Sequence, residues 1–177
     1  MKLIALIAVA GLAASVPQEE PKPGKEHELL KQFVGEWNAE CKFWMDPAQP
    51  PMEMKGTESC TLGPGPFWVT SVFKGEIFGK PFEGRSTTGY SPLKKKYVGT
   101  WIDSMVPHLF TSEGTADEAG KVITFIADGL DPATGKEVKE RWVIELQGAD
   151  KHTMTMYVPG ADGKERKNGE IVYTRKK

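Results

Sequence analysis

Short strand-like runs recur along most of this sequence, and turn signals separate them. Within the runs, apolar and polar side chains alternate, as they do in a β-strand that buries one face. The connectors are short, which favours neighbouring strands joined as hairpins. The pattern therefore predicts an all-β protein, a single up-and-down antiparallel barrel of about ten strands, because closure removes exposed edges. The predicted strands begin near Glu36, Glu53, Phe67, Pro81, Lys96, His108, Lys121, Glu137, Lys151 and Glu165.

The two ends of the predicted barrel carry signals of their own. Residues 26–33, EHELLKQF, place apolar side chains at helical spacing and predict one short amphipathic helix before the first strand. Trp37 follows this helix, and Arg175 ends the last strand. First and last strands are neighbours in a closed meander, so Arg175 could stack on Trp37 as a cation over an aromatic face. An exposed arginine in a basic tail is the alternative.

The N-terminus has the layout of a secretory signal peptide. Lys2 precedes an unbroken apolar run, and small residues follow it before a polar stretch. The run is too short to span a bilayer as an anchor. We therefore expect residues 1–15 to be a signal peptide, 16–25 a flexible leader and 26–177 one β-barrel domain. The mature protein is expected to be exported, either periplasmic or secreted, with no membrane span.

Charge excludes one class of partner. Removal of Lys2 leaves 22 of the 23 lysines and arginines, against 24 acidic residues. No basic stripe remains to neutralise phosphates, so we expect no nucleic-acid partner. The sequence does not indicate an oligomeric state.

Two cysteines, Cys41 and Cys60, flank a turn-rich segment, residues 46–51. The strand-like runs on either side are expected to pair as a hairpin. A register that sets Trp44 against Thr57 also sets Cys41 opposite Cys60. Disulfides persist in exported chains, so we expect a bridge here, worth about 3 kcal/mol. A pair of free buried thiols is the alternative.

The run YVGTWIDSMVPH, residues 97–108, brings an aspartate, a serine and a histidine close together in sequence. Side chains alternate along a strand, so Asp103 and Ser104 point to opposite faces. That geometry argues against a hydrolase triad, and the exposed nucleophile turn of such enzymes is missing. We expect both side chains to stabilise the turn through residues 105–107. A polar contact of Asp103 or His108 at a cavity mouth is the alternative.

Metal and cofactor signals are weak. The three histidines, His27, His108 and His152, are not paired at ligand spacing, and a zinc site would need both cysteines and a distant histidine. Haem held by His108 or His152 would lack an axial motif. No glycine-rich loop leads from a strand into a helix. The sequence therefore predicts no metal and no cofactor.

Alternation also indicates which side chains face the lumen. With Trp37 inward, Ala39, Cys41 and Phe43 follow it, and the proposed hairpin places Glu58 inward as well. On a later strand Val138, Glu140, Trp142, Ile144 and Leu146 share one face. Glu58 and Glu140 are thus candidate lumen carboxylates, although an error of one residue in register would turn each to the surface.

Several stretches resemble a known family. The glycine, one residue and tryptophan after the short helix resemble the opening of calycin barrels, the lipocalins and fatty-acid-binding proteins. Nearly the whole mature chain is similar to the bacterial Domain of Unknown Function 1579 family, which implies a calycin-like barrel and leaves the activity open. The matching stretches are LKQFVGEW at 30–37, WMDPAQPP at 44–51, residues 56–58, FKGEIFGKPFEG at 73–84, YVGTWIDSM at 97–105, residues 113–120 and IVYTRK at 171–176.

These observations predict a binding protein in preference to an enzyme. Aromatic and methionine side chains mixed with a few polar groups are typical of an apolar-ligand pocket, so the expected partner is a small apolar or amphipathic molecule. One alternative is a lumenal isomerase or hydrolase with Glu58, Glu140 or Asp103 as general base. Another is a filled barrel that binds a protein through its outer surface. The candidate ligand-binding residues are Trp37, Tyr90, Trp101, Asp103, His108, Glu140 and Trp142.

Overall fold

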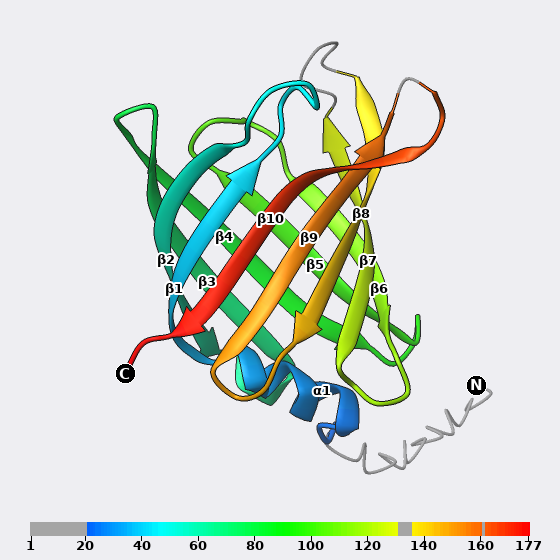
Figure 1. Cartoon of the computed structure of the whole chain (residues 1–177). Helices are drawn as coiled ribbons and strands as arrows, with labels where there is room; N and C mark the ends of the chain where they lie inside the picture. Colours follow the sequence, from blue (N-terminus) through cyan, green and yellow to red (C-terminus); the bar gives the residue numbers. More distant parts are fainter. Residues whose placement is uncertain (1–20, 131–135, 161) are drawn as a thin grey trace, which may run out of the picture.

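The protein is a closed antiparallel barrel of ten strands (Figure 1). The computed structural model describes residues 21–130, 136–160 and 162–177. A short helix, α1 (Lys25–Leu30), and a single 3-10 turn, η1 (Lys31–Phe33), precede the sheet, and a second turn, η2 (Gly65–Phe67), precedes the third strand. The strands are β1 (Gly35–Phe43), β2 (Met52–Leu62), β3 (Trp68–Ile77), β4 (Lys80–Ser91), β5 (Lys96–Asp103), β6 (Phe110–Ala116), β7 (Val122–Leu130), β8 (Glu137–Leu146), β9 (Lys151–Pro159) and β10 (Glu165–Arg175).

The all-β barrel and its short helix are confirmed. Each strand pairs with its neighbours in sequence, and β10 closes the sheet on β1. Every predicted strand start lies within two residues of the observed one; the largest difference is at β6, which begins at Phe110. The predicted signal peptide and residues 16–20 of the leader lie outside the described residues, as does the predicted turn at 131–135.

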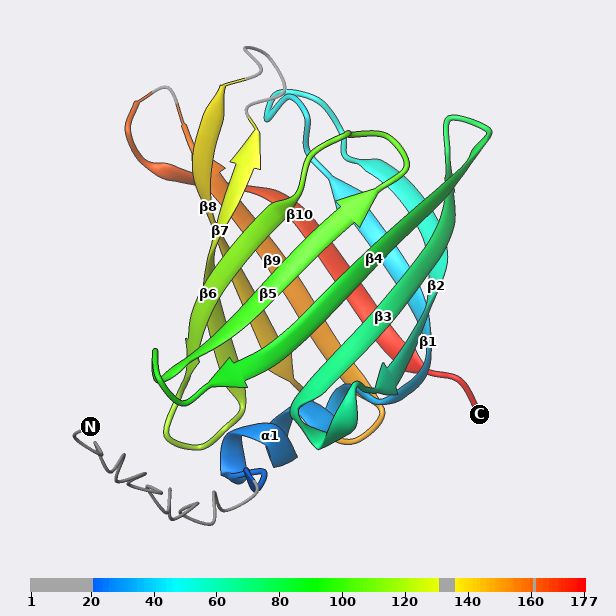
Figure 2. The ribbon, with the colours of Figure 1, turned by 180° about the vertical axis from the view of Figure 1, so that it is seen from behind.

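The barrel has two different ends. We call the end covered by α1 and η1 the base; β1 starts there and β10 ends there (Figures 1 and 2). We call the opposite end the rim, where β5 ends and β8 begins. Buried Leu29 and Leu30 turn from α1 toward the core. The helix therefore closes the base with apolar side chains.

Arg175 fastens the last strand to the base. Its guanidinium carbon lies 4.1 Å from the ring centroid of Trp37, so the predicted stacking is confirmed. Its Nη1 donates to the Val34 carbonyl at 2.8 Å, and its Nη2 to that of Gln32 at 3.0 Å. The arginine thus holds β10, β1 and the segment leading out of η1 in one arrangement.

The first hairpin differs from the predicted register. Cys41 pairs with Met54, and Cys60 pairs with Gly35, so the predicted pairing of the two cysteines is wrong. Both thiols are free and buried, and no bridge joins them. The reason is the connector: it runs from the end of β1 at Phe43 to the start of β2 at Met52, which shifts the pairing by an even number of residues.

An even shift leaves every side chain on its predicted face. Trp37, Ala39 and Cys41 are buried while the residues between them are exposed, as alternation predicted. Glu58, opposite Trp37, likewise faces inward. Within the described part of the chain, no helix has the length and apolar character needed to cross a membrane.

Candidate functional site

The lumen of the barrel holds a cavity of about 610 Å³. The cavity runs from Leu30 and Phe33 at the base to Asp103 and Val106 at the rim. Its wall is mostly aromatic, aliphatic and methionine side chains, with a few polar groups between them. A cavity of this volume and lining is typical of small-molecule sites. The described barrel is therefore hollow, which argues against the filled barrel.

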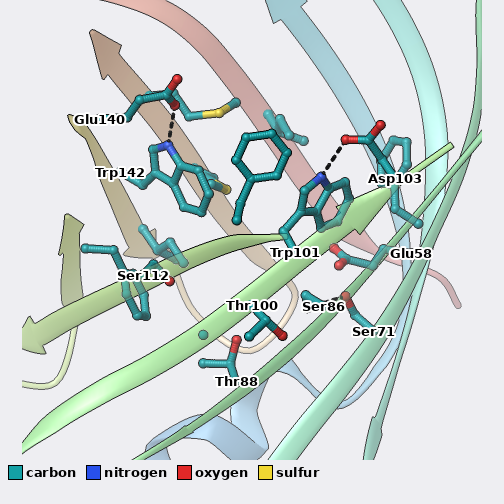
Figure 3. Close-up of a pocket in the computed structure, with 18 of the residues that line it drawn as sticks. Glu58, Ser71, Ser86, Thr88, Thr100, Trp101, Asp103, Ser112, Glu140 and Trp142 are labelled. Atoms are coloured by element: carbon teal, nitrogen blue, oxygen red, sulfur yellow. Dashed lines mark hydrogen bonds between the residues drawn. The ribbon is translucent and has the colours of Figure 1, made fainter. Parts of the chain in front are cut away.

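Trp101 and Asp103 form the first polar pair of the wall, on β5 near the rim (Figure 3). Trp101 Nε1 donates to Asp103 Oδ2 at 3.0 Å. The other carboxylate oxygen, Oδ1, accepts the backbone N–H groups of Met105 at 2.8 Å and Val106 at 2.9 Å. Asp103 thus stabilises the turn after β5, as predicted, and also lines the cavity mouth.

Glu140 and Trp142 form a second pair of the same design, on β8. Trp142 Nε1 donates to Glu140 Oε2 at 2.8 Å, and both side chains line the cavity (Figure 3). Burial raises the pKa of Glu140, and the indole hydrogen bond offsets part of this rise. In both pairs residues two apart share one strand face, so each carboxyl orients the indole beside it.

Each acid–indole pair packs over a glycine of the neighbouring strand. A Cβ on Gly84 of β4 would lie 2.1 Å from the Trp101 ring, and one on Gly129 of β7 would lie 2.4 Å from Glu140 Oε1. The missing side chains let the indole and the carboxyl lie close against the sheet. Both pairs are therefore positioned by packing as well as by hydrogen bonds.

Glu58 lies deeper, toward the base. Its carboxyl interacts with the hydroxyl groups of Ser71 and Tyr173, which favour its ionised form, and Ser71 Oγ is 2.8 Å from Ser86 Oγ. Burial raises the pKa of Glu58, more than these interactions lower it. Figure 3 shows Glu58, Ser71 and Ser86 together on one wall. They form a polar island in an otherwise apolar part of the lumen.

His152 lines the cavity at the base. Its ring stacks on Tyr173, with the ring centroids 4.4 Å apart, and meets Trp37 and Phe33 edge to face. Burial, with a smaller contribution from Arg175, lowers its pKa to about 4, so the imidazole is neutral at ordinary pH. Its Nδ1 is buried and has no hydrogen-bond partner in the described structure.

The structure brings four of the seven predicted ligand-binding residues together, and these are Trp101, Asp103, Glu140 and Trp142. The other three lie outside the cavity wall. Trp37 packs beneath Arg175, Tyr90 contacts the rings of His27 and Tyr97 at the base, and His108 lies against Phe110 beyond the rim.

Three wall residues were missed or given another role: Ser71, Tyr173 and His152. Tyr173 could have been found from the closure of β10 on β1, which sets it opposite the inward-facing Ala39. His152 follows because it pairs with Tyr173. Ser71 is a small polar residue in β3, and nothing in its local sequence indicated its contact with Glu58.

No catalytic triad is assembled in the run at residues 97–108. Ser104 Oγ accepts the backbone N–H of Glu83 on the outside of the sheet, whereas Asp103 faces the cavity. Among the described residues, no group of three or more His, Cys, Asp or Glu side chains is placed to hold a metal ion. Burial raises the pKa of Cys41 to about 12 and that of Cys60 still further, so neither thiol forms a reactive thiolate.

Fold and site together define a hollow ten-stranded β-barrel with a small-molecule-sized lumen. Residues 22–175 match the family described as "Protein of unknown function (DUF1579)", so the chain belongs to that family. No match is found among curated proteins.

Several solved structures align with this chain at low sequence identity. The crystal structure of Rv2717c from M. tuberculosis aligns with a TM-score of 0.58 and 15% identity, over 88% of this chain and all 100% of that one. EF1p2_mFAP2b bound to DFHBI aligns with a TM-score of 0.46 and 9% identity, over 85% of this chain and 99% of that one. A redesigned β-barrel, mFAP0, also bound to DFHBI, aligns with a TM-score of 0.42 and 14% identity, over 81% of this chain and 99% of that one. Rv2717c is similar to this chain in fold, and the likeness extends no further.

Proposed function

We propose that this protein is an exported carrier or sensor that binds a small, largely apolar or amphipathic molecule inside its barrel. The observation that carries the proposal is the cavity of about 610 Å³, walled by aromatic, aliphatic and methionine side chains. A filled core would have satisfied the same hydrophobic pattern at lower cost, because voids forfeit packing contacts. A cavity maintained at this size is better explained by an occupant.

Export is supported by the N-terminal sequence alone. A cationic start, an apolar run and a small-residue boundary precede the polar leader, which is the layout that secretion machinery recognises. In a periplasmic or extracellular setting, a barrel of this kind would transport or sense a molecule that dissolves poorly in water.

Native mass spectrometry tests the proposal. The mature protein is purified from the organism that makes it, and its mass is measured before and after denaturation. We expect a discrete extra mass that is lost on unfolding, and the difference identifies the molecule. A bare-chain mass before denaturation would count against a tightly held ligand.

A lumenal enzyme is the second candidate, and Glu58 is the observation that favours it. Its buried carboxyl has a raised pKa and lies between two hydroxyl groups inside a cavity. Such a group can move a proton to or from a bound substrate. If the molecule identified by mass spectrometry is chemically changed on incubation, Glu58→Gln should abolish turnover and leave binding intact. Unchanged ligand after prolonged incubation with the wild-type protein would exclude this candidate.

A further inference from the structure

The charged groups of the cavity wall all have one sign. Among the described residues that line it there is no lysine and no arginine. Glu58, Asp103 and Glu140 project their carboxyls inward, whereas the carboxyl of Asp128 is bound by Lys139 and Thr111 away from the lumen. The only histidine of the described wall, His152, is neutral. The lumen can therefore stabilise positive charge but not negative charge.

The two carboxyls nearest the rim are each joined to an indole. Asp103 holds Trp101, and Glu140 holds Trp142, from strands on different sides of the cavity mouth (Figure 3). An indole face attracts an ammonium group through its quadrupole, and a carboxylate attracts it through charge and hydrogen bonding. Paired aromatic and carboxylate groups in a water-poor cavity are therefore suited to an organic cation.

Resting on the proposed lumenal binding, we propose that the ligand is an amphipathic amine. Its ammonium group binds at the acid–indole pairs Trp101–Asp103 and Glu140–Trp142 near the rim. Its apolar body extends toward the base, along the aromatic and methionine wall. An amphiphile with a carboxylate or sulfate head is rejected, because the lumen would bury that anion beside like charges with no cation to pair with it.

A second observation at the base also indicates a ligand. His152 is only 5% exposed, yet its Nδ1 has no hydrogen-bond partner in the described structure. Buried polar atoms are normally paired, because leaving one unpaired costs free energy. The imidazole lines the same cavity as the acid–indole pairs. A ligand long enough to reach the base would place a neutral hydrogen-bonding group, such as a hydroxyl or an amide, against this nitrogen.

Three probes that share one alkyl chain test the charge class: dodecylamine, dodecanol and dodecanoate. Each is titrated into the mature protein at neutral pH, dodecylamine and dodecanoate below their critical micelle concentrations and dodecanol below its solubility limit. Tryptophan fluorescence and calorimetry are the readouts. We expect dodecylamine to bind at least about tenfold more tightly than dodecanoate, since tenfold corresponds to about 1.4 kcal/mol and one favourable charge contact supplies that. The affinity for dodecanol should lie between the affinities for dodecylamine and dodecanoate.

The outcomes separate the two proposals. Dodecanoate binding as tightly as dodecylamine, or more tightly, would overturn the amine assignment and leave lumenal binding intact. Failure of all three probes to bind would count against lumenal binding itself.

Substitutions test which carboxyl groups cause the preference for an amine. Glu140→Gln should weaken dodecylamine about fivefold and leave dodecanol unchanged, because only the charged head loses a partner. Asp103→Asn should act in the same direction, although it also weakens the turn after β5. Glu40→Gln is the matched control: it removes one negative charge from the exposed face of β1, where Glu40 pairs with Lys55 at 3.6 Å. Equal loss of dodecylamine affinity in Glu40→Gln and Glu140→Gln would overturn the assignment to the lumen.

Discussion

The base and the rim of the barrel use similar side chains for opposite purposes. At the base, Arg175 lies over Trp37 and donates to the backbone carbonyls of Gln32 and Val34, so its charge is fully engaged within the protein. At the rim, Asp103 and Glu140 orient indoles that face an open cavity. Both ends combine a tryptophan with a charge, but the base satisfies the charge internally.

Under the proposed function, this difference separates the end that closes the barrel from the end that would hold the ligand. The cation–aromatic contact of Arg175 with Trp37 stabilises the closure of β10 on β1. The rim pairs leave carboxylate lone pairs and indole faces available to another molecule. Exposed apolar residues occur at both ends: Met45, Phe78, Met105 and Leu109 lie in loops at the rim, and Leu93 lies in a loop at the base. We therefore assign closure of the barrel to the base and, under the proposed function, recognition of the ligand to the rim.

The largest expected effect is a loss of stability when a contact at the base is removed. Arg175→Ala removes the contact with Trp37 and the donors to three backbone carbonyls, and we expect the free energy of unfolding to fall by about 3 kcal/mol. Arg166→Ala is the rim counterpart, because among the described residues Arg166 Nη1 donates to the Trp44 carbonyl alone, at 3.2 Å. It should cost less than about 1 kcal/mol. Urea unfolding of both variants measures the difference, and equal losses would break the contrast between the ends.

The next effect is a pH dependence of stability at the base. The pKa of His152 falls from 6.5 to about 4 in the folded protein, chiefly through burial. Between about pH 6.5 and 4, the histidine is protonated in the unfolded chain but not in the folded chain. The unfolded state is therefore favoured, and His152 lowers the free energy of unfolding as the pH falls through this range. The full loss approaches about 3 kcal/mol, at about 1.4 kcal/mol for each pH unit.

The histidine contribution is isolated by difference. His152→Phe keeps an aromatic ring against Tyr173 and removes the titration. We expect the wild type to lose stability relative to this variant as the pH falls over that range. Glu58 and Glu140 change stability in the opposite direction, but both proteins contain them, so their contributions cancel in the difference. Parallel stability curves for the two proteins would show that His152 is not desolvated.

A smaller effect is expected at the glycines of the rim. Gly84→Ala places a methyl 2.1 Å from the rigid Trp101 ring, and we expect a loss of about 2 kcal/mol together with weaker ligand binding. Gly129→Ala meets the flexible end of Glu140 instead, so it should cost less than about 1 kcal/mol. Thermal unfolding and dodecylamine titration compare the two. A larger loss of stability for Gly129→Ala than for Gly84→Ala would show that the Trp101 ring is less tightly held than the Glu140 side chain.

The sequence predicted the barrel well because alternation and turn residues are local signals. The inward faces of β1 and β8 followed from alternation alone, and so did the lumen positions of Glu140 and Trp142. The cysteine register failed because strand pairing depends on connector length, which residues 46–51 did not define. Glu58 was still placed correctly, since a shift by an even number of residues preserves the face.

Depth within the lumen could not be predicted. Trp37 and Tyr90 face inward as expected, yet the helix packs over the base and removes both from the cavity wall. That arrangement depends on where α1 docks, which no local pattern records. The interaction of Glu58 with Ser71 and Tyr173 joins residues from β2, β3 and β10, so it exists only once the barrel has closed.

Filling the lumen tests the central claim most directly, that the hollow barrel is the binding site. Ser112 lines the cavity on β6, and Ser112→Phe should fill part of it, whereas Thr115→Phe adds the same ring to the exposed face of the same strand. Dodecanol, which carries no charge, is titrated into both variants after circular dichroism confirms that each is folded. We expect Ser112→Phe to lose at least about tenfold in affinity, about 1.4 kcal/mol, and Thr115→Phe to bind like the wild type. Equal affinity in the two variants would contradict binding in the lumen.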